Sequence, residues 1–258
     1  MQFAKYQGTG NDFILIDDRQ LFFPENSEFI AKLCNRHFGI GADGILLLRN
    51  LEGYDFEMIY FNSDGSAATF CGNGGRCIVA FAQSLEIIEN DCRFKAADGE
   101  HSAKIIGLNN NETIVSLEMR NAIIYENNSN SCYLNTGTFH FVEFVNDPQV
   151  LDIVSLGRNI RYSERFAPHG TNVNFVKQVD DTLFVRTYEK GVENETLSCG
   201  TGVTASAVAA SLRDGGSNYT IHTAGGVLQV RLANNNNIFS DIYLQGPAIC
   251  VFEGYLTS

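Results

Sequence analysis

The stretch YEKGVENETLSCGTGVTASAVAASL, residues 188–212, sets Cys199 directly before Gly-Thr-Gly and a long run of small, helix-compatible residues. A second stretch, YFNSDGSAATFCGNGGRCIVAFAQSL, residues 60–85, repeats this plan around Cys71. In both, a tyrosine stands 11 positions before the cysteine, a glycine follows it directly, and another glycine lies three positions on. The two cysteines are 128 positions apart in a chain of 258 residues, which indicates that each half carries one copy of a duplicated unit.

The duplication extends beyond the two cysteine motifs. Gly44 and Asn172 each lie 27 residues before their cysteine, and Asn11 and Thr138 lie 60 and 61 residues before it. Each half opens on a β-branched and aromatic segment, DFILID or HFVEFV, and a proline marks the expected start of a helix near Pro24-Glu25 and near Pro148-Gln149. We therefore predict an α+β fold of two similar lobes. The first is expected over 1–120, completed by a returning C-terminal strand over 247–258, and the second over 121–246.

Composition and charge exclude several classes of protein. With 44% hydrophobic and 19% charged residues the chain is typical of a globular protein. Its net charge of −12, without a Lys/Arg cluster, argues against nucleic acid or an anionic membrane as a partner. No apolar run approaches the ~20 residues that span a bilayer, and the first residues have no apolar signal core. Seven scattered cysteines without CxxC spacing predict neither disulfides nor a metal site, and they suit the cytoplasm.

The chemistry that we expect rests on Cys71 and Cys199 at the starts of two helices. Backbone N–H groups and the helix dipole favour a thiolate there, and they can also hold a substrate carboxylate. Two lobes related by approximate two-fold symmetry would bring the two thiols to face each other across an interlobe cleft. One thiolate could then remove a proton from a carbon while the opposite thiol protonates its other face, with the sulfurs about 7 Å apart. No Schiff-base lysine motif is evident, so this chemistry needs no pyridoxal cofactor. The other five cysteines are expected to be buried structural residues.

Several motifs resemble those of diaminopimelate epimerase, in the order found in that family: KYQGTGNDF, RHFGIGAD, FNSDGS, FCGNGGRC, GTNVNFV and YEKGVENETLSCGTG. The resemblance covers nearly the whole chain. It implies two pseudo-symmetric lobes, each a mixed β-sheet curled around a central helix. It also implies an isomerase that interconverts LL- and meso-diaminopimelate without a cofactor, for lysine and peptidoglycan synthesis, and it suggests a homodimer.

The resemblance also implies residue roles. Cys71 and Cys199 match the acid/base pair, Glu189 a carboxylate near the substrate amino group, and His140 a histidine that supports catalysis. Two further sets match substrate-binding positions. The reacting amino-acid end is held by Asn11, Gly72, Asn73, Gly200 and Thr201, and the distal end by Asn62, Asn172 and Lys190.

Four residues depart from the usual family pattern. The family usually has Arg at the position of Lys190, and a point charge does not grip a carboxylate as a planar guanidinium does. Many members have Asn-Pro where this chain has Thr138-Phe139, and Gln is common at the position of Gly44. All of these changes fall near the expected distal-end pocket, so the inversion chemistry is predicted more firmly than the substrate.

Three other readings compete with this one. The chain could be a two-thiol racemase of the proline racemase kind that acts on a different amino acid. It could instead be a non-catalytic module that binds an anionic metabolite at its two helix starts, although this gives no reason for cysteine at both positions. Finally, a Cys71–Cys199 disulfide would be an oxidative hazard, and it would require the Cα atoms to approach to roughly 4.4–6.8 Å.

Overall fold

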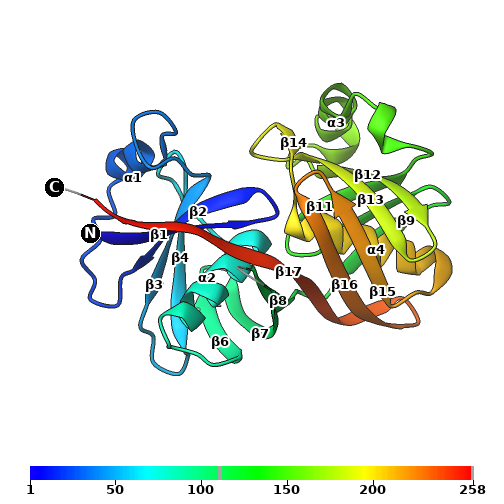
Figure 1. The fold of residues 1–258 in the computed structure, drawn as a ribbon. Helices are drawn as coiled ribbons and strands as arrows, with labels where there is room; N and C mark the ends of the chain where they lie inside the picture. The colour runs from blue at the N-terminus through cyan, green and yellow to red at the C-terminus, as the bar shows by residue number, and fades with distance from the viewer. Residues whose placement is uncertain (110–111, 257–258) are drawn as a thin grey trace. The chain divides into compact units, whose positions relative to one another are not determined.

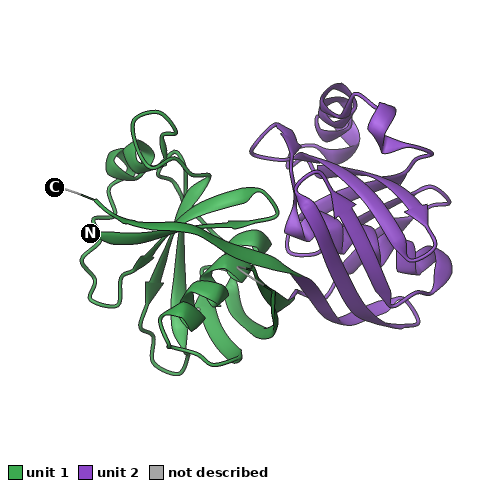
Figure 2. Ribbon diagram, in the orientation of Figure 1, with its two compact units in different colours: residues 1–117, 246–258 green, residues 118–245 purple. Residues whose placement is uncertain are grey.

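The computed structural model describes residues 1–109 and 112–256, which form two compact units. Unit 1 contains residues 1–117 and 246–258, and unit 2 contains residues 118–245 (Figure 2). The last two residues of the predicted C-terminal strand, 257–258, lie outside the described residues. Both units are sheets with helices, so the predicted α+β class is confirmed.

In unit 1, a continuous ladder of strands runs from the N-terminal strand round to the C-terminal one. β1 pairs antiparallel with β2, β2 is parallel to β3, β3 is antiparallel to β4, and β4 is parallel to β6. The ladder continues through β7 and β8 to β17, whose C-terminal part pairs with β1 (Figure 1). The elements are β1 (Gln2–Gly8), β2 (Asn11–Asp17), α1 (Ser27–Cys34), β3 (Gly44–Arg49), β4 (Phe56–Asn62), β5 (Ala67–Ala68), α2 (Gly72–Ser84), β6 (Asp91–Ala96), β7 (Gly99–Asn109) and β8 (Glu112–Glu118).

Unit 2 repeats this ladder. β10 pairs antiparallel with β11, β11 is parallel to β12, β12 is antiparallel to β13, and β13 is parallel to β15. β15 then pairs with β16, and β16 with the first part of β17. The elements are β9 (Ile123–Asn127), β10 (Ser131–Asn135), β11 (Phe139–Phe144), η1 (Pro148–Val150), α3 (Ile153–Arg161), η2 (Glu164–Phe166), β12 (Asn172–Val179), β13 (Thr182–Glu189), β14 (Asn194–Thr196), α4 (Gly200–Asp214), β15 (Asn218–Thr223), β16 (Gly226–Asn235) and β17 (Ile238–Tyr255).

The two units also match in how their ladders are completed. β9 pairs antiparallel with β10, the first strand of the repeated ladder in unit 2. The C-terminal part of β17 pairs in the same sense with β1, the first strand of the ladder in unit 1. In chain order, β9 comes at the end of the first repeat but pairs in the ladder of unit 2. The end of β17 comes at the end of the second repeat but pairs in the ladder of unit 1.

A central helix fills each unit. In α2, every residue from Gly72 to Ala82 is buried, and the helix packs on β1, β2, β3 and β7 (Figure 1). In α4, Gly200 and all residues from Gly202 to Ser211 are buried against β10–β13, β15 and β16. Glycine, alanine and serine make up most of the buried residues of α4, and glycine and alanine nearly half of those of α2. Small residues let a helix lie close to strands on several sides. The prediction that each of two similar units is a mixed sheet curled around a central helix is therefore confirmed.

The outer helices begin later than the prolines suggested. α1 begins at Ser27, because the Asn26 side chain accepts from the backbone N–H of Phe29 and caps it. Near Pro148 there is only a 3-10 turn capped by Asp147, and α3 begins at Ile153 with Asp152 as its cap. An Asp or Asn cap satisfies a helix N–H group directly, so it marks a helix start more strongly than a proline one turn earlier.

Candidate active site

Cys71 is the N-cap residue of α2, in an extended conformation with φ −141° and ψ 125°. Its thiol donates to the Asn11 Oδ1 atom over 3.4 Å, and the Asn73 Nδ2 atom donates to the same oxygen over 3.4 Å. Three of the predicted site residues of unit 1 therefore lie together. The first turn of a helix also supplies N–H groups without intrahelical partners, which suits an anionic ligand.

Asn11 is held at this position by a tight turn and by a carboxylate. Thr9 and Gly10 both have positive φ, 51° and 84°, in the two-residue turn between β1 and β2. Positive φ is uncommon for a β-branched residue such as Thr9, so this turn is strained. The Asn11 Nδ2 atom donates to Asp43 Oδ2 over 2.6 Å. A carboxylate accepts only, so Asp43 fixes the amide orientation with Oδ1 toward Cys71.

Arg76 lies behind these groups and is completely buried. Its guanidinium donates to Asn73 Oδ1 over 3.0 Å, to Thr9 Oγ1 over 3.3 Å and to the carbonyls of Gly72 and Pro247. Within residues 1–109 and 112–256, no carboxylate forms an ion pair with it. Gly8 leaves the space that the guanidinium occupies, since a Cβ there would stand 3.3 Å from Arg76 Nη2.

Cys199 is the N-cap residue of α4, with φ −115° and ψ 110°, and is 6% exposed. Its sulfur lies 3.6 Å from Thr201 Oγ1, which in turn lies 2.9 Å from His140 Nε2. Three predicted site residues of unit 2 thus lie together. Burial lowers the pKa of His140 to about 3, so its ring is neutral at physiological pH.

Three more predicted residues, Asn172, Glu189 and Lys190, lie at the start of β12 and the end of β13. Gly72 and Gly200 are the first residues of α2 and α4. The Asn172 side chain donates to the Phe139 carbonyl and accepts from the Lys190 backbone N–H over 2.8 Å. Glu189, the last residue of β13, accepts from the Thr196 hydroxyl. In unit 1, Asn62 ends β4 and bonds to the Ser66 hydroxyl over 3.1 Å, within a turn.

The chain matches a known protein family over nearly its whole length. A family model described as diaminopimelate epimerase matches residues 3–123 and 132–251. A protein of Flavobacterium psychrophilum with that name is 50% identical, covering 98% of this chain and 99% of its own. One of Aquifex aeolicus is 39% identical, covering 100% and 98%. This chain belongs to the diaminopimelate epimerase family.

Solved structures with the same fold are distant in sequence. A phenazine biosynthesis protein of the PhzF family from Bacillus anthracis has a TM-score of 0.78 at 14% identity, covering 100% of this chain and 99% of its own. A hydroxyproline epimerase from Agrobacterium vitis has a TM-score of 0.71 at 14% identity, covering 98% and 91%. At this identity the likeness shows the fold alone, shared by the family and these neighbours.

Four of the other cysteines, Cys34, Cys77, Cys92 and Cys132, are buried as expected, whereas Cys250 is only partly buried. None of the seven cysteines, all of which lie in the described residues, forms a disulfide. Burial raises the pKa of Cys34 to about 11 and those of Cys77, Cys92 and Cys132 to about 12, and it also raises the pKa of Cys250. A thiol with a raised pKa is protonated at neutral pH and is a poor base or nucleophile.

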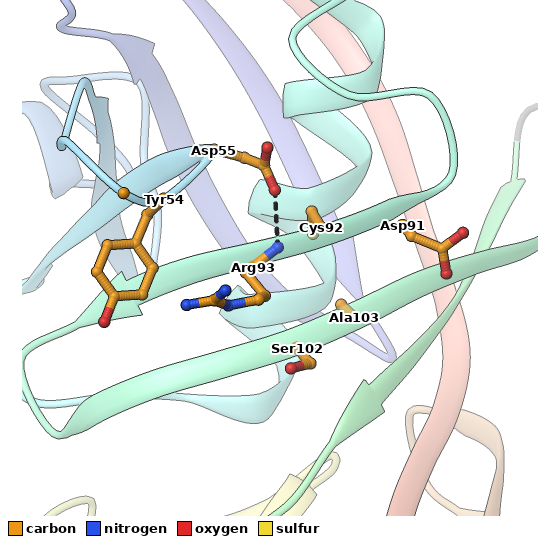
Figure 3. Close-up of a pocket in the computed structure, with 8 residues that line it drawn as sticks. Tyr54, Asp55, Asp91, Cys92, Arg93, Ser102 and Ala103 are labelled. Carbon is orange, nitrogen blue, oxygen red and sulfur yellow. Dashed lines mark hydrogen bonds between the residues drawn. The ribbon is translucent and has the colours of Figure 1, made fainter.

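One surface depression of unit 1 lies away from the predicted site residues. It is lined by residues of β6, β7 and the segment before β4 (Figure 3). There, Asp55 accepts from the Arg93 backbone N–H over 2.8 Å, and the Arg93 side chain pairs with Glu100 and stacks on Tyr54. These polar groups are committed to one another, so the depression has no convergent groups aimed at a ligand.

Two features are absent from the described residues, 1–109 and 112–256. They contain no group of three or more His, Cys, Asp or Glu side chains placed to hold a metal ion. None of their helices is long and apolar enough to cross a membrane.

Arg76 and Asn174 were not among the predicted site residues, although both lie inside the motifs FCGNGGRC and GTNVNFV. Asn174 donates to His140 Nδ1 over 3.1 Å, and Arg76 orients Asn73. Their spacing carried a signal. Asn172 and Asn174 are two apart on one strand and so share a face, and Arg76 follows Asn73 by three positions on one helix and so lies beside it.

Proposed function

We propose that this protein interconverts LL- and meso-diaminopimelate by carrying the α-proton on two cysteine thiols, Cys71 and Cys199. The observation that supports it most is the equivalence of the two residues. Each is the N-cap of the buried central helix of its unit, in a chain of the diaminopimelate epimerase family. Cysteine is a poor helix cap, and neither thiol accepts a capping hydrogen bond. Its occurrence at both equivalent positions is therefore better explained by chemistry than by helix stability.

The proposed reaction moves one proton off the α-carbon and another onto it. A thiolate takes the α-proton and becomes a thiol, leaving the C–H electron pair on the α-carbon and its carboxylate as an enolate-like anion. The second thiol gives its proton to the opposite face of the carbon and becomes a thiolate, so configuration inverts and charge balances. Hydrogen-bond donors at a helix N-terminus would stabilise the carboxylate as this charge develops.

Other residues are proposed in supporting roles. Asn11, Gly72, Asn73, Gly200 and Thr201 would hold the reacting amino-acid end, and their contacts with or beside the two cysteines support this. Asn172 and Lys190, joined by a hydrogen bond, would grip the distal end together with Asn62. Glu189 would lie near the amino group and His140 would support catalysis. The product would serve lysine and peptidoglycan synthesis.

The test is LL-diaminopimelate in D₂O with reductant and without pyridoxal phosphate, followed by NMR and mass spectrometry. We expect deuterium at the inverted carbon of the meso product, abolished by Cys71→Ala and, separately, by Cys199→Ala. Cys132→Ala is the matched control because it removes a buried thiol of raised pKa, and it should retain exchange. Exchange that survives both single substitutions would refute the two-thiol mechanism.

A second candidate is epimerisation of another amino acid by the same thiols. It is favoured by Gly44, which stands where glutamine is common in the family. A Cβ at this position would stand 2.5 Å from the Phe61 carbonyl oxygen and 2.7 Å from the Tyr60 ring. A larger side chain at this position therefore does not fit the present backbone. A panel of amino acids in the same D₂O assay separates the candidates, since exchange only with a substrate lacking a distal carboxylate would favour the second.

We further propose a cytoplasmic homodimer. The seven free cysteines support a reducing compartment, and burial keeps at least four of them protonated. Light scattering on purified protein tests the assembly, because a dimer has twice the chain mass of 28.5 kDa. A single species of 28.5 kDa at micromolar concentration would contradict the dimer.

A further inference from the structure

A chain of hydrogen-bonded side chains leads from the interior of unit 2 to Cys199. The Thr187 hydroxyl bonds to Asn174 Oδ1 over 2.9 Å, and Asn174 Nδ2 bonds to His140 Nδ1 over 3.1 Å. His140 Nε2 and Thr201 Oγ1 are 2.9 Å apart, and Thr201 Oγ1 lies 3.6 Å from the Cys199 sulfur. Asn174 and His140 are both fully buried, so water does not compete for these bonds.

The direction of this chain is set at Asn174. Its side chain also bonds to the backbone carbonyl of Phe141 over 3.2 Å. A carbonyl only accepts, so the amide NH₂ must face Phe141, and its second hydrogen then points at His140 Nδ1. Turning the amide over would set Oδ1 against the Phe141 carbonyl oxygen, with no hydrogen between them.

His140 therefore carries its proton on Nε2. Nδ1 faces a donor and must accept, and burial keeps the ring neutral with a single proton. The two groups that bond to the ring nitrogens, Asn174 and Thr201, are uncharged and do not titrate. In the neighbouring strands, Leu134 of β10 and Asn172 of β12 pair with His140, and they do not titrate either.

Thr201 completes the chain. Its oxygen accepts the Nε2–H hydrogen, so its own hydroxyl hydrogen is left to point at the other neighbour, the Cys199 sulfur. Gly202 makes room for this geometry. A Cβ at that position would stand 2.5 Å from Asn174 Oδ1 and 3.3 Å from the Cys199 sulfur.

We propose that Asn174 is a positioning residue that, through the Nε2–H tautomer of His140, aims the Thr201 hydroxyl hydrogen at the sulfur of Cys199. A donor aimed at a sulfur favours its thiolate form, the form that acts as a base. The importance of this arrangement for catalysis rests on the proposed role of Cys199. The direction of the hydrogen bonds does not depend on that role, because it follows from the contacts of Asn174.

Unit 1 has a different residue at the position that corresponds to His140. By strand pairing, Phe13 is the counterpart of His140, since Phe13 pairs with Gly44 as His140 pairs with Asn172. One contact of Cys71 there is with an acceptor, Asn11 Oδ1, which receives the thiol hydrogen. This contact is opposite in kind to the one that the Thr201 hydroxyl makes with Cys199.

The first arm of the test is ¹⁵N NMR of histidine-labelled protein. We expect the His140 signals of an Nε2–H tautomer between pH 6 and 8, and of an Nδ1–H tautomer in Asn174→Asp, whose carboxylate can only accept. A merely structural role for Asn174 would not change the tautomer. An Nδ1–H tautomer in the unaltered protein would overturn the proposal.

The second arm measures the pH dependence of Cys199 alkylation by iodoacetamide, read from the Cys199 peptide by mass spectrometry. Thr201→Val, which is isosteric but lacks the hydroxyl, should lower the thiolate fraction at neutral pH about tenfold, as expected for one lost hydrogen bond to a charged atom. Thr201→Ser should restore the normal profile. Ser206→Ala is the matched control, because that hydroxyl bonds only to the Gly202 carbonyl of the same helix.

The outcomes separate the two proposals. Unchanged alkylation in Thr201→Val would overturn the inference even if Asn174→Asp failed to fold. If the tautomer and alkylation behave as expected but Cys199→Ala still exchanges the α-proton, the hydrogen-bond direction stands and the two-thiol mechanism fails.

Discussion

The guanidinium of Arg76 donates to the side-chain oxygen of Asn73 over 3.0 Å, one turn into α2. This bond leaves the Asn73 amide hydrogens to face Asn11 Oδ1, the atom that also receives the Cys71 thiol. Burial lowers the pKa of Arg76, yet an arginine remains charged in proteins. A buried cation therefore stands behind the helix start at which we expect a substrate carboxylate to bind.

We predict that Arg76→Lys keeps the fold but raises KM for diaminopimelate about tenfold or more. Lysine retains the charge but cannot bond Asn73 and Thr9 with a planar fork. Steady-state kinetics and a thermal melt check this. Arg93→Lys on the surface of β6 is the control, since the Arg93 side chain is 59% exposed and pairs with Glu100. Unchanged KM in Arg76→Lys would show that the Asn73 orientation does not depend on the guanidinium.

Gly202→Ala is expected to lower kcat by about a hundredfold, while the protein stays folded. The added Cβ would approach Asn174 Oδ1 to 2.5 Å and the Cys199 sulfur to 3.3 Å, and an ångström of displacement at a catalytic group costs about that factor. Gly107→Ala in β7 is the matched control, since its nearest neighbour would be 3.8 Å away. Parallel kinetics and melts compare the two; full activity in Gly202→Ala would mean that the helix start can relax.

His140 makes the stability of the protein depend on pH in a defined window. The folded-state pKa of about 3 lies below the ordinary value of 6.5, so below pH 6.5 the unfolded chain takes up a proton that the folded one does not. The contribution of His140 to the free energy of unfolding is therefore fully present above pH 6.5. It falls by about 1.4 kcal/mol per pH unit between pH 6.5 and pH 3.

Urea unfolding at pH 6, 5 and 4 tests this against His140→Gln, whose profile should be flatter by that amount. The measurements stop at pH 4 because the titration of Asp12 contributes at lower pH. Burial raises the pKa of Asp12, but hydrogen bonds from Arg36 and Lys5 outweigh it and bring the value to about 2. Equal slopes in the two proteins would show that His140 is not buried in neutral form.

At the proposed distal end, we predict that Lys190→Arg lowers KM for diaminopimelate severalfold and that Lys190→Ala raises it at least tenfold. Arginine can bond both oxygens of a carboxylate, and the bond from the Lys190 backbone N–H to Asn172 holds the position in every variant. The exposed Lys104 of β7 is the control for loss of a lysine. If Lys190→Ala binds the substrate normally, the distal carboxylate is held elsewhere.

The fold was predictable because equivalent motifs recur at a nearly constant distance along the chain. Cys71 and Cys199 sit at the same place in two ladders of the same order, and spacing in a repeat survives changes of side chain. The start of α3 was not predictable from Pro148, because capping by Asp152 decides it.

Two features of the candidate site could not be predicted from the sequence. Arg76 reads as an ordinary helix residue, and only the closed sheet around α2 shows that its charge is buried. The tautomer of His140 depends on the Phe141 carbonyl, a backbone atom that no residue pattern reports.

The strand exchange at the ends of the two units bears on how the chain is made. β1 leaves the ribosome well before residues 249–255, the partner for one of its edges, because all of unit 2 is translated between them. A nascent chain therefore keeps that edge of β1 unpaired until residues 249–255 have been made, while unit 2 acquires every strand of its own ladder up to Gln245 beforehand. Synthesis of residues 249–255, rather than completion of the first half, is the event that allows the sheet of unit 1 to close.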